Sequence, residues 1–335
     1  MSFRWGIAGT GVIANSFADA LGRLPDAHLV AVGSRSRKGA DAFGEKHGIA
    51  ARHRHASYED LAADDTVDIV YVASPHSHHH EHTLLFLNAG RPVLCEKAFS
   101  LDAEQAAEMV AVSRERGLFL MEAMWSRFLP AYVKVRELLA EDVIGEVQSL
   151  EADFGFQFPA DPEHRLFDRA LGGGSLLDLG VYPLSLASMV LGTPDRVTAY
   201  GTLGSTGVDE HVAVLSGYDS GAVALAQSSM RANLGCTARI TGTEGHIELP
   251  FLMHCPDELT VQTRGTTERL SLPAAREGDG DDTAGGGLHR QIRHVQERLR
   301  AGELESEIMP LDETVAVMRT LDTVRDQIGL SYTTH

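Results

Sequence analysis

The chain has 335 residues, of which 43% are hydrophobic and 23% charged, and its formal net charge is −18. Such a length allows two domains with separate cores, and the composition is typical of a globular protein. An acidic surface repels phosphate backbones and anionic lipids, so we expect neither a nucleic-acid partner nor a membrane partner.

The cysteines and the N-terminal stretch bear on the cellular compartment. Three scattered cysteines without Cys-x-x-Cys spacing predict neither a disulfide framework nor a zinc site, and they suit a reducing compartment. The first predicted strand begins at Phe3, so we expect no signal peptide, and we find no apolar run long enough to span a bilayer. We therefore expect a cytoplasmic protein.

The N-terminal stretch has the order strand, glycine-rich turn, helix. Residues 3–8 (FRWGIA) are mostly apolar, and the turn that follows reads Gly-x-Gly-x-x-Ala, which is the fingerprint of a dinucleotide-binding fold. Its first glycine permits a sharp turn, its second lets a pyrophosphate approach the backbone, and the helix start presents N–H groups to the phosphates. An ordinary tight turn is the alternative for these six residues alone. The expected cofactor contacts in the turn are Gly9, Thr10, Gly11, Val12 and Ile13.

Strands and helices alternate up to about residue 120, which predicts a doubly wound parallel sheet with right-handed crossovers. Ser100 is the expected cap of the helix that begins near it. We assign residues 1–122 to a dinucleotide-binding Rossmann domain. Its further strands are expected at 29–33, 67–73, 92–95 and 118–121, and its helices at 39–47, 81–89 and from about residue 100.

The pattern changes after Pro130. A helix at 132–139 leads to residues 147–158, where apolar and polar side chains alternate as in a strand with one buried face. A glycine cluster and then a helix follow, within residues 172–191. Short turns then separate six strand candidates, which predicts a mostly antiparallel sheet. These candidates are 196–203, 212–218, 222–229, 237–241, 246–249 and 259–263.

Residues 123–335 therefore form, by expectation, a second domain of the α+β type. Within it, residues 273–287 are polar and rich in glycine and predict a mobile loop. Helices are expected at 288–299 and 312–328, and packing of these last helices back onto the first domain is left open.

The turn after the second predicted strand favours NADP over NAD. It reads GSRSRK, and no Asp or Glu occurs between Asp26 and Asp41. A carboxylate at this place would hold the ribose 2′-hydroxyl of NAD, whereas Ser and Arg can donate hydrogen bonds to the 2′-phosphate of NADP. A solvated basic turn is the alternative. The expected contacts are Ser34, Arg35 and Lys38.

Three residues have the chemistry for proton transfer. Lys97 follows the strand at 92–95, and parallel sheets present ligands at that edge. Asp178 and Tyr182 are four residues apart and project from one helical face, just before Pro183, which should kink the helix. A surface lysine and a core tyrosine are the alternatives.

Several separated motifs resemble the glucose–fructose oxidoreductase/inositol dehydrogenase (Gfo/Idh/MocA) family. They are AGTGVIA (8–14), VASPHSHH (72–79), CEKA (95–98) and GGGSLLDLGVYP (172–183). Further segments resemble one subgroup of the family, the dimeric dihydrodiol dehydrogenases, also described as NADP-dependent D-xylose 1-dehydrogenases. They are FRWGIA (3–8), LFLMEAMWSRFLP (118–130), TGVDEHVAVL (206–215), ITGTEGHIELP (240–250) and CPDEL (255–259). The resemblance implies a nicotinamide-binding N-terminal domain and a homodimer or homotetramer formed through the C-terminal sheet.

The resemblance also assigns roles to residues. It makes Lys97 the catalytic lysine and Tyr182 the acid or base, with Asp178 one turn earlier. Tyr182 would then accept the hydroxyl proton with Lys97 as the cation that stabilises its phenolate, or Lys97 would exchange the proton directly. Glu96 and Lys97 are also expected to contact the cofactor, and Tyr182 the substrate. The family usually has proline after the lysine, where this chain has Ala98. Contacts to the cofactor are implied for Ser74, Pro75, His76 and His79, and contacts to the substrate for Trp125 and Phe154.

The expected function is hydride transfer between NADP and a carbinol or carbonyl carbon of a sugar or cyclic diol; the exact substrate and the direction are left open. The histidines at 76–82 suggest a metal site, but the His-Glu-x-x-His order is absent and we expect no metal. Two competing hypotheses are a non-catalytic NADP-binding scaffold and a biosynthetic keto-sugar reductase.

Overall fold

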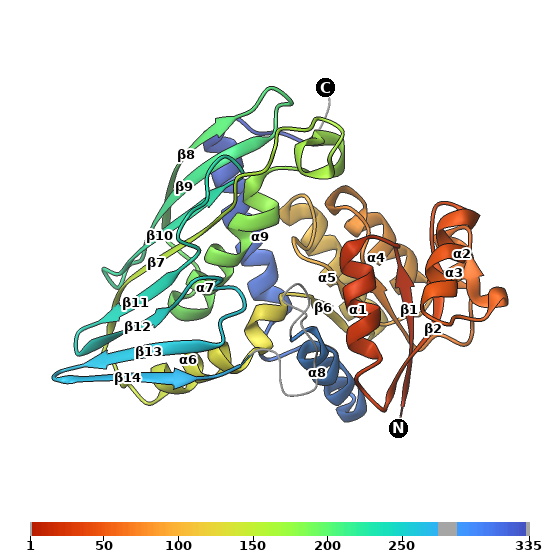
Figure 1. Cartoon of the computed structure of the whole chain (residues 1–335), viewed down its shortest axis with the longest axis horizontal. Helices are drawn as coiled ribbons and strands as arrows, with labels where there is room; N and C mark the ends of the chain where they lie inside the picture. The colour runs from red at the N-terminus through yellow and green to blue at the C-terminus, as the bar shows by residue number, and fades with distance from the viewer. Residues whose placement is uncertain (1, 274–286, 333–335) are drawn as a thin grey trace. The chain divides into compact units, whose positions relative to one another are not determined.

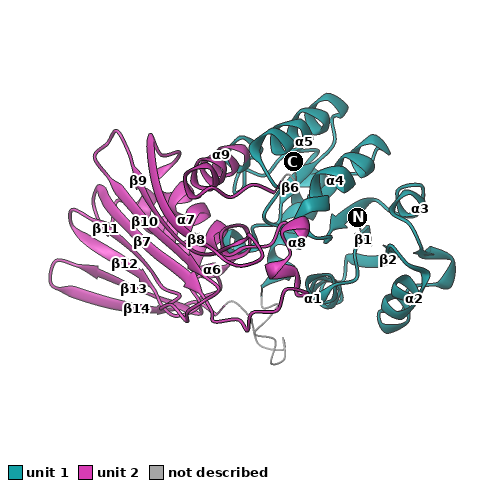
Figure 2. Ribbon diagram, turned by 90° about the horizontal axis from the view of Figure 1, so that it is seen from above, with its two compact units in different colours: residues 1–128, 279–314 teal, residues 129–278, 315–335 magenta. Residues whose placement is uncertain are grey.

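A computed structural model describes residues 2–273 and 287–332 (Figure 1). The chain divides into two compact units, which Figure 2 colours separately. Unit 1 is Met1–Phe128 with Asp279–Thr314, and unit 2 is Leu129–Gly278 with Val315–His335. The division thus falls at Phe128, a few residues after the boundary expected from the sequence, and a later segment joins the first unit.

Unit 1 contains a six-stranded sheet in the order β3-β2-β1-β4-β5-β6, and every neighbouring pair is parallel. The strand order reverses between β1 and β4, which is where doubly wound sheets bind ligands. The predicted Rossmann-type fold is confirmed. The strands are β1 (Phe3–Ala8), β2 (Ala27–Gly33), β3 (Arg54–His55), β4 (Ile69–Val72), β5 (Val93–Cys95) and β6 (Leu120–Glu122).

Helices connect these strands, and one helix start differs from the expectation. The cap of α5 is Asp102, whose side chain accepts a hydrogen bond from the N–H of Gln105 at 2.8 Å. Ser100 instead donates its hydroxyl to the Asp102 carbonyl. The α-helices of unit 1 are α1 (Val12–Leu21), α2 (Arg37–Lys46), α3 (Tyr58–Ala62), α4 (His79–Asn88), α5 (Ala103–Arg116) and α8 (Leu288–Ala301).

Unit 2 contains an eight-stranded sheet in the order β14-β13-β12-β11-β7-β10-β9-β8. Its described pairs are antiparallel except for β7 with β10, so the prediction of a mostly antiparallel sheet is confirmed. The last strand was not predicted. The strands are β7 (Val147–Gly155), β8 (Arg196–Leu203), β9 (Asp209–Gly217), β10 (Val223–Ser229), β11 (Ala238–Gly242), β12 (Gly245–Leu249), β13 (Glu258–Thr263) and β14 (Thr266–Ser271).

Helices α6 (Pro130–Ala140), α7 (Val181–Leu191) and α9 (Leu311–Ile328) lie on one side of this sheet (Figure 1), and α7 packs on β7 and β10. A π-helical turn, Leu176–Gly180, precedes α7. Pro183 has no N–H to donate to the carbonyl four residues earlier. The missing hydrogen bond explains why the helix widens into a π-helical turn just before it. The sequence placed a glycine cluster before this helix, and in the structure those glycines form a bend after the 3₁₀ turn Arg169–Leu171.

The expectation that no apolar run is long enough to span a bilayer is wrong. Among the described residues, the helical run Arg169–Leu191 is long and apolar enough to cross a membrane by length and composition. The structure buries 78% of its most apolar window, as expected for a core helix that is apolar on most sides. Most of the loop expected at 273–287 lies outside the described residues.

Candidate active site

The glycine turn between β1 and α1 has the geometry of a phosphate-binding turn. Gly9 has φ +124°, and a Cβ there would lie 2.6 Å from the carbonyl oxygen of Ala73, so only glycine fits. A Cβ on Gly11 would meet no atom within 4 Å, which leaves the backbone open to a ligand. Gly11 is also the N-cap of α1, and no side chain caps this helix. The first N–H groups of α1 can therefore bind an anion.

The turn after β2 places basic side chains beside a buried serine. Ser34 is buried, and its N–H donates to the carbonyl of His55 at 3.1 Å. Arg35 and Lys38 are exposed, and within the described part of the chain neither forms an ion pair. Ser36 caps α2 through the N–H of Gly39 at 3.1 Å. This turn can therefore receive an anionic group without a competing carboxylate.

The histidine segment after β4 bonds within unit 1. The ring nitrogens of His79 lie 2.8 Å from the carbonyl oxygens of Ala98 and Ser74, and His82 Nδ1 lies 3.0 Å from Ser74 Oγ. Burial lowers the pKa of His79 to about 3 and that of His82 to about 4. Within the described residues, this segment forms no group of three metal-ligating atoms. His76 is buried beside His79.

Lys97 lies two residues after the end of β5, at the carboxyl edge of the parallel sheet. Its backbone N–H donates to Glu96 Oε2 at 3.2 Å, while the hydroxyl of Tyr71 donates to Glu96 Oε1. The Lys97–Ala98 peptide bond is cis, at the position where the resembling family carries proline. The buried Glu96 therefore connects the lysine backbone to the neighbouring strand β4.

Glu122, which ends β6, is a further acidic residue at this edge, and sequence reasoning missed it. It is fully buried, and burial raises the pKa of its carboxyl to about 7. Thr314 Oγ1 donates to Glu122 Oε2 at 3.1 Å. Trp125, a predicted substrate residue, is buried in the short helix Trp125–Phe128 of the same unit.

Tyr182, in unit 2, belongs to a buried aromatic cluster. The ring of Phe154 lies 5.3 Å from the ring of Tyr182, and the ring of His254 lies 5.3 Å from Tyr182 and 4.4 Å from Phe154. The structure thus brings the predicted pair Tyr182 and Phe154 together. His254 has no motif around it, and only the tertiary structure places it here.

Asp178 lies in the π-helical turn and forms an ion pair with Arg165, with Nη1 and Oδ1 3.1 Å apart. Sequence reasoning missed Arg165, which lies 13 residues earlier in a separate 3₁₀ turn. The guanidinium holds the Asp178 carboxylate in place, so this carboxylate can orient a neighbouring polar group rather than move freely.

The three glycines before the π-helical turn have a different role from the expected one. A Cβ on Gly174, where φ is +124°, would overlap Asp209 Oδ1, and one on Gly173 would lie 2.6 Å from the carbonyl oxygen of Leu166. Protein atoms therefore approach Gly173 and Gly174 closely. The buried Asp209 carboxylate accepts hydrogen bonds from Ser175 Oγ and from the N–H of Leu176, both at 2.7 Å.

A parallel sheet with an uncapped glycine turn, a basic turn after β2 and a lysine after β5 defines a nucleotide-dependent oxidoreductase. Two family models match this chain. Residues 3–124 match the oxidoreductase family with an NAD-binding Rossmann fold, and residues 132–248 match the GFO/IDH/MocA C-terminal domain. The chain belongs to the GFO/IDH/MocA oxidoreductase family, as the sequence motifs predicted.

Individual relatives match over nearly the full length. The chain is 38% identical to the trans-1,2-dihydrobenzene-1,2-diol dehydrogenase of Sus scrofa, over 99% of this chain and 98% of that one. The Homo sapiens protein of the same name is 37% identical with the same coverage. Among solved structures, KijD10, a 3-ketoreductase from Actinomadura kijaniata in complex with TDP-benzene and NADP, has a TM-score of 0.82 at 27% identity and 98% coverage of both chains. An aldose-aldose oxidoreductase from Caulobacter crescentus has a TM-score of 0.87 at 25% identity, covering 98% of this chain and 97% of that one.

Proposed function

We propose that the protein is an NADP-dependent dehydrogenase that acts on a carbinol or carbonyl carbon of a sugar or cyclic diol. The observation that carries the proposal is the pairing of an open, uncapped glycine turn with a basic turn after β2. The full-length similarity to named dihydrodiol dehydrogenases and to a sugar ketoreductase supports the substrate class.

The residues of unit 1 fit NADP. The α1 start and Gly11 would hold the pyrophosphate, and Ser34, Arg35 and Lys38 would hold the 2′-phosphate, because no carboxylate repels it there. We further propose Ser74, Pro75, His76 and His79 as contacts to the nicotinamide half. When bound, NADP supplies the acceptor or donor of the hydride.

Unit 2 supplies the acid or base. Tyr182 accepts the proton that the substrate hydroxyl loses on oxidation, and returns it on reduction. Two roles remain open for Lys97, either as the cation that stabilises the phenolate of Tyr182 or as the group that exchanges the proton directly. Asp178, which is held by Arg165, orients the substrate hydroxyl that exchanges its proton with Tyr182. Trp125 and Phe154 are proposed to contact the carbon skeleton of the substrate.

A substrate panel tests the proposal. The purified protein is mixed with aldoses, trans-dihydrodiols and other sugars in the presence of NADP⁺ or NAD⁺, and reduced nicotinamide is followed by its absorbance. We expect turnover with NADP⁺ that Lys97→Met abolishes while NADP still binds. Turnover only with keto-sugars and NADPH would favour a biosynthetic reductase. Cofactor binding without turnover on any substrate would favour a scaffold.

We also propose a homodimer or homotetramer formed through the open face of the sheet in unit 2. On this face Tyr200 is 79% exposed and Leu215 and Leu225 are each 47% exposed, and the two leucines are partners on neighbouring strands. Such a patch is self-complementary across a two-fold axis. Leu225→Glu should yield monomers in light scattering after gel filtration, and an unchanged mass would contradict the proposed interface.

The cytoplasm is the proposed compartment, where the acidic chain would work without a nucleic-acid or membrane partner. All three cysteines are free thiols, which suits a reducing environment. Fractionation of the source cells tests the proposal, and recovery of the protein in a membrane or secreted fraction would contradict it.

A further inference from the structure

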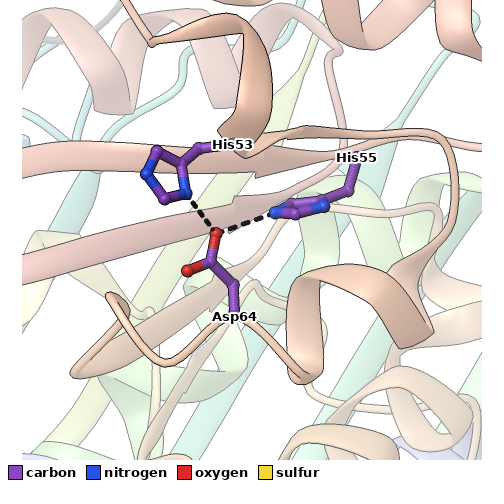
Figure 3. Close-up of side chains that lie close together, drawn as sticks. All are labelled: His53, His55 and Asp64. Atoms are coloured by element: carbon purple, nitrogen blue, oxygen red, sulfur yellow. Dashed lines mark hydrogen bonds and ion pairs between the residues drawn. The ribbon is translucent and has the colours of Figure 1, made fainter.

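Two histidines and an aspartate converge at the β3 edge of the parallel sheet. His53 Nδ1 lies 2.7 Å from Asp64 Oδ2, and His55 Nε2 lies 2.8 Å from the same oxygen. Figure 3 shows the two rings approaching the carboxylate from different sides. One potential ligand atom from each residue lies within 4.8 Å of the others. We propose that His53, His55 and Asp64 bind one divalent transition-metal ion of the zinc type.

Local structure explains the convergence. His53 ends a 3₁₀ turn and His55 ends β3, so two residues of a nearly extended segment present their side chains to the same side. Asp64 follows α3, and its other oxygen, Oδ1, accepts hydrogen bonds from the N–H and the hydroxyl of Thr66 at 3.0 and 2.6 Å. The carboxylate is thereby fixed with Oδ2 toward the histidines, as outer hydrogen bonds fix metal ligands.

The donor set matches zinc chemistry. Two imidazole nitrogens and one carboxylate oxygen are ligands that Zn²⁺ prefers, and three protein ligands leave a fourth position for water. Zinc bonds of ~2.0–2.2 Å with tetrahedral angles separate neighbouring ligand atoms by about 3.3 Å. The present separations of 2.7 and 2.8 Å must therefore widen by about half an ångström, which a rotation of partly exposed side chains supplies. The exposed fractions are 15% for His53, 16% for His55 and 5% for Asp64.

Ion binding requires each histidine to move a proton. In the hydrogen-bonded arrangement each ring donates an N–H to Asp64, so the ligating nitrogen must give up that proton before it binds the ion. In His55 the other ring nitrogen can take up the proton. For His53 the other nitrogen, Nε2, already accepts a hydrogen bond from Arg52 Nε at 3.0 Å, and the exposed Arg52 must swing aside.

An ion at this place would stabilise the neighbouring strand and turn. β3 pairs with β2 at Gly33, the carbonyl of His55 accepts from Ser34, and the Arg37 guanidinium donates to the carbonyl of Arg54. The ion would therefore fasten the strand that supports the turn after β2. A coupling to the cofactor rests on the proposed function, whereas ion binding itself does not.

Zinc titration without cofactor tests the site. The full-length protein is treated with EDTA, dialysed and titrated with Zn²⁺ against a chromophoric chelator. We expect one tight equivalent, and an affinity at least tenfold lower in His55→Gln and Asp64→Asn. Thr66→Val keeps all three ligands and should weaken binding by about 10- to 100-fold, as outer hydrogen bonds typically do. Arg52→Ala should bind zinc more tightly, because it removes a competing donor and a positive charge.

Two further histidine variants complete the test. His28→Gln removes an exposed histidine on β2 and should leave the affinity unchanged. His78→Gln should also leave it unchanged. Absence of a tight equivalent in the unmodified protein overturns the proposal, as does zinc binding that survives His55→Gln and disappears in His78→Gln. Thermal melting of the zinc-free variants shows whether each one folds. If a ligand variant does not fold, Thr66→Val still tests the proposal, because it keeps all three ligands.

Discussion

The buried carboxyl of Asp209 should make the stability of unit 2 depend on pH. Burial raises its pKa from 3.8 to about 7, while the unfolded chain ionises it near its ordinary value. The folded state therefore holds a proton that the unfolded state has already lost between about pH 4 and pH 7. Stability is full below the lower value and is lost as the pH rises through the higher one.

The magnitude follows from these two pKa values. Between pH 5 and pH 8 the wild-type protein should lose about 2.6 kcal/mol of unfolding free energy through Asp209 alone, because one pKa unit corresponds to ~1.36 kcal/mol. Asp209→Asn resembles the protonated acid in shape and does not titrate. The difference between variant and wild type should therefore grow by about this amount over the same interval.

Urea unfolding followed by far-ultraviolet circular dichroism at several pH values measures this difference. Both tryptophans, Trp5 and Trp125, lie in unit 1, so their fluorescence alone would follow the other unit. Asp219→Asn, at an exposed aspartate of unit 2, is the control and should parallel the wild type. Parallel curves for Asp209→Asn and wild type would refute the reasoning.

Three further predictions concern unit 1. Arg35→Asp should weaken binding of NADP far more than binding of NAD in fluorescence titrations, and equal losses would contradict the assignment of the 2′-phosphate turn. Gly9→Ala should lower stability by ~1–3 kcal/mol in thermal unfolding, because φ +124° and the Ala73 carbonyl leave no room for a Cβ. Glu122→Gln should flatten the fall in stability between pH 5 and pH 8 that burial of this carboxyl predicts, as seen in unfolding of unit 1 by tryptophan fluorescence.

Local patterns predicted most of the fold. The turn from β1 to α1 depends on residues that are adjacent in the chain. Exposed and less exposed side chains alternate along most of β8, so neighbouring residues alone predict this strand. β14 was missed because its side chains are polar and mostly exposed, so it has no buried face to alternate. β3 is two residues long and too short for any period.

The sequence predicted residues of the candidate active site only where they belong to a recognisable motif. Lys97 and Tyr182 stand in recognisable segments, and so did the glycines before the π-helical turn, although protein atoms closely approach two of those glycines. His254 and Arg165 have no local signal. Each approaches the predicted residues from a part of the chain whose own pattern shows nothing unusual.

Taken alone, the sequence determined the sheet types, the nucleotide turns and the family, because these depend on periodicity and on residues a few positions apart. Only the tertiary structure decided which carboxylates are buried, what lies against each glycine, and that His53 and His55 meet Asp64. The physical reason is that burial and ligand geometry arise where folding brings distant segments together. The local order of the residues does not indicate which segments these are.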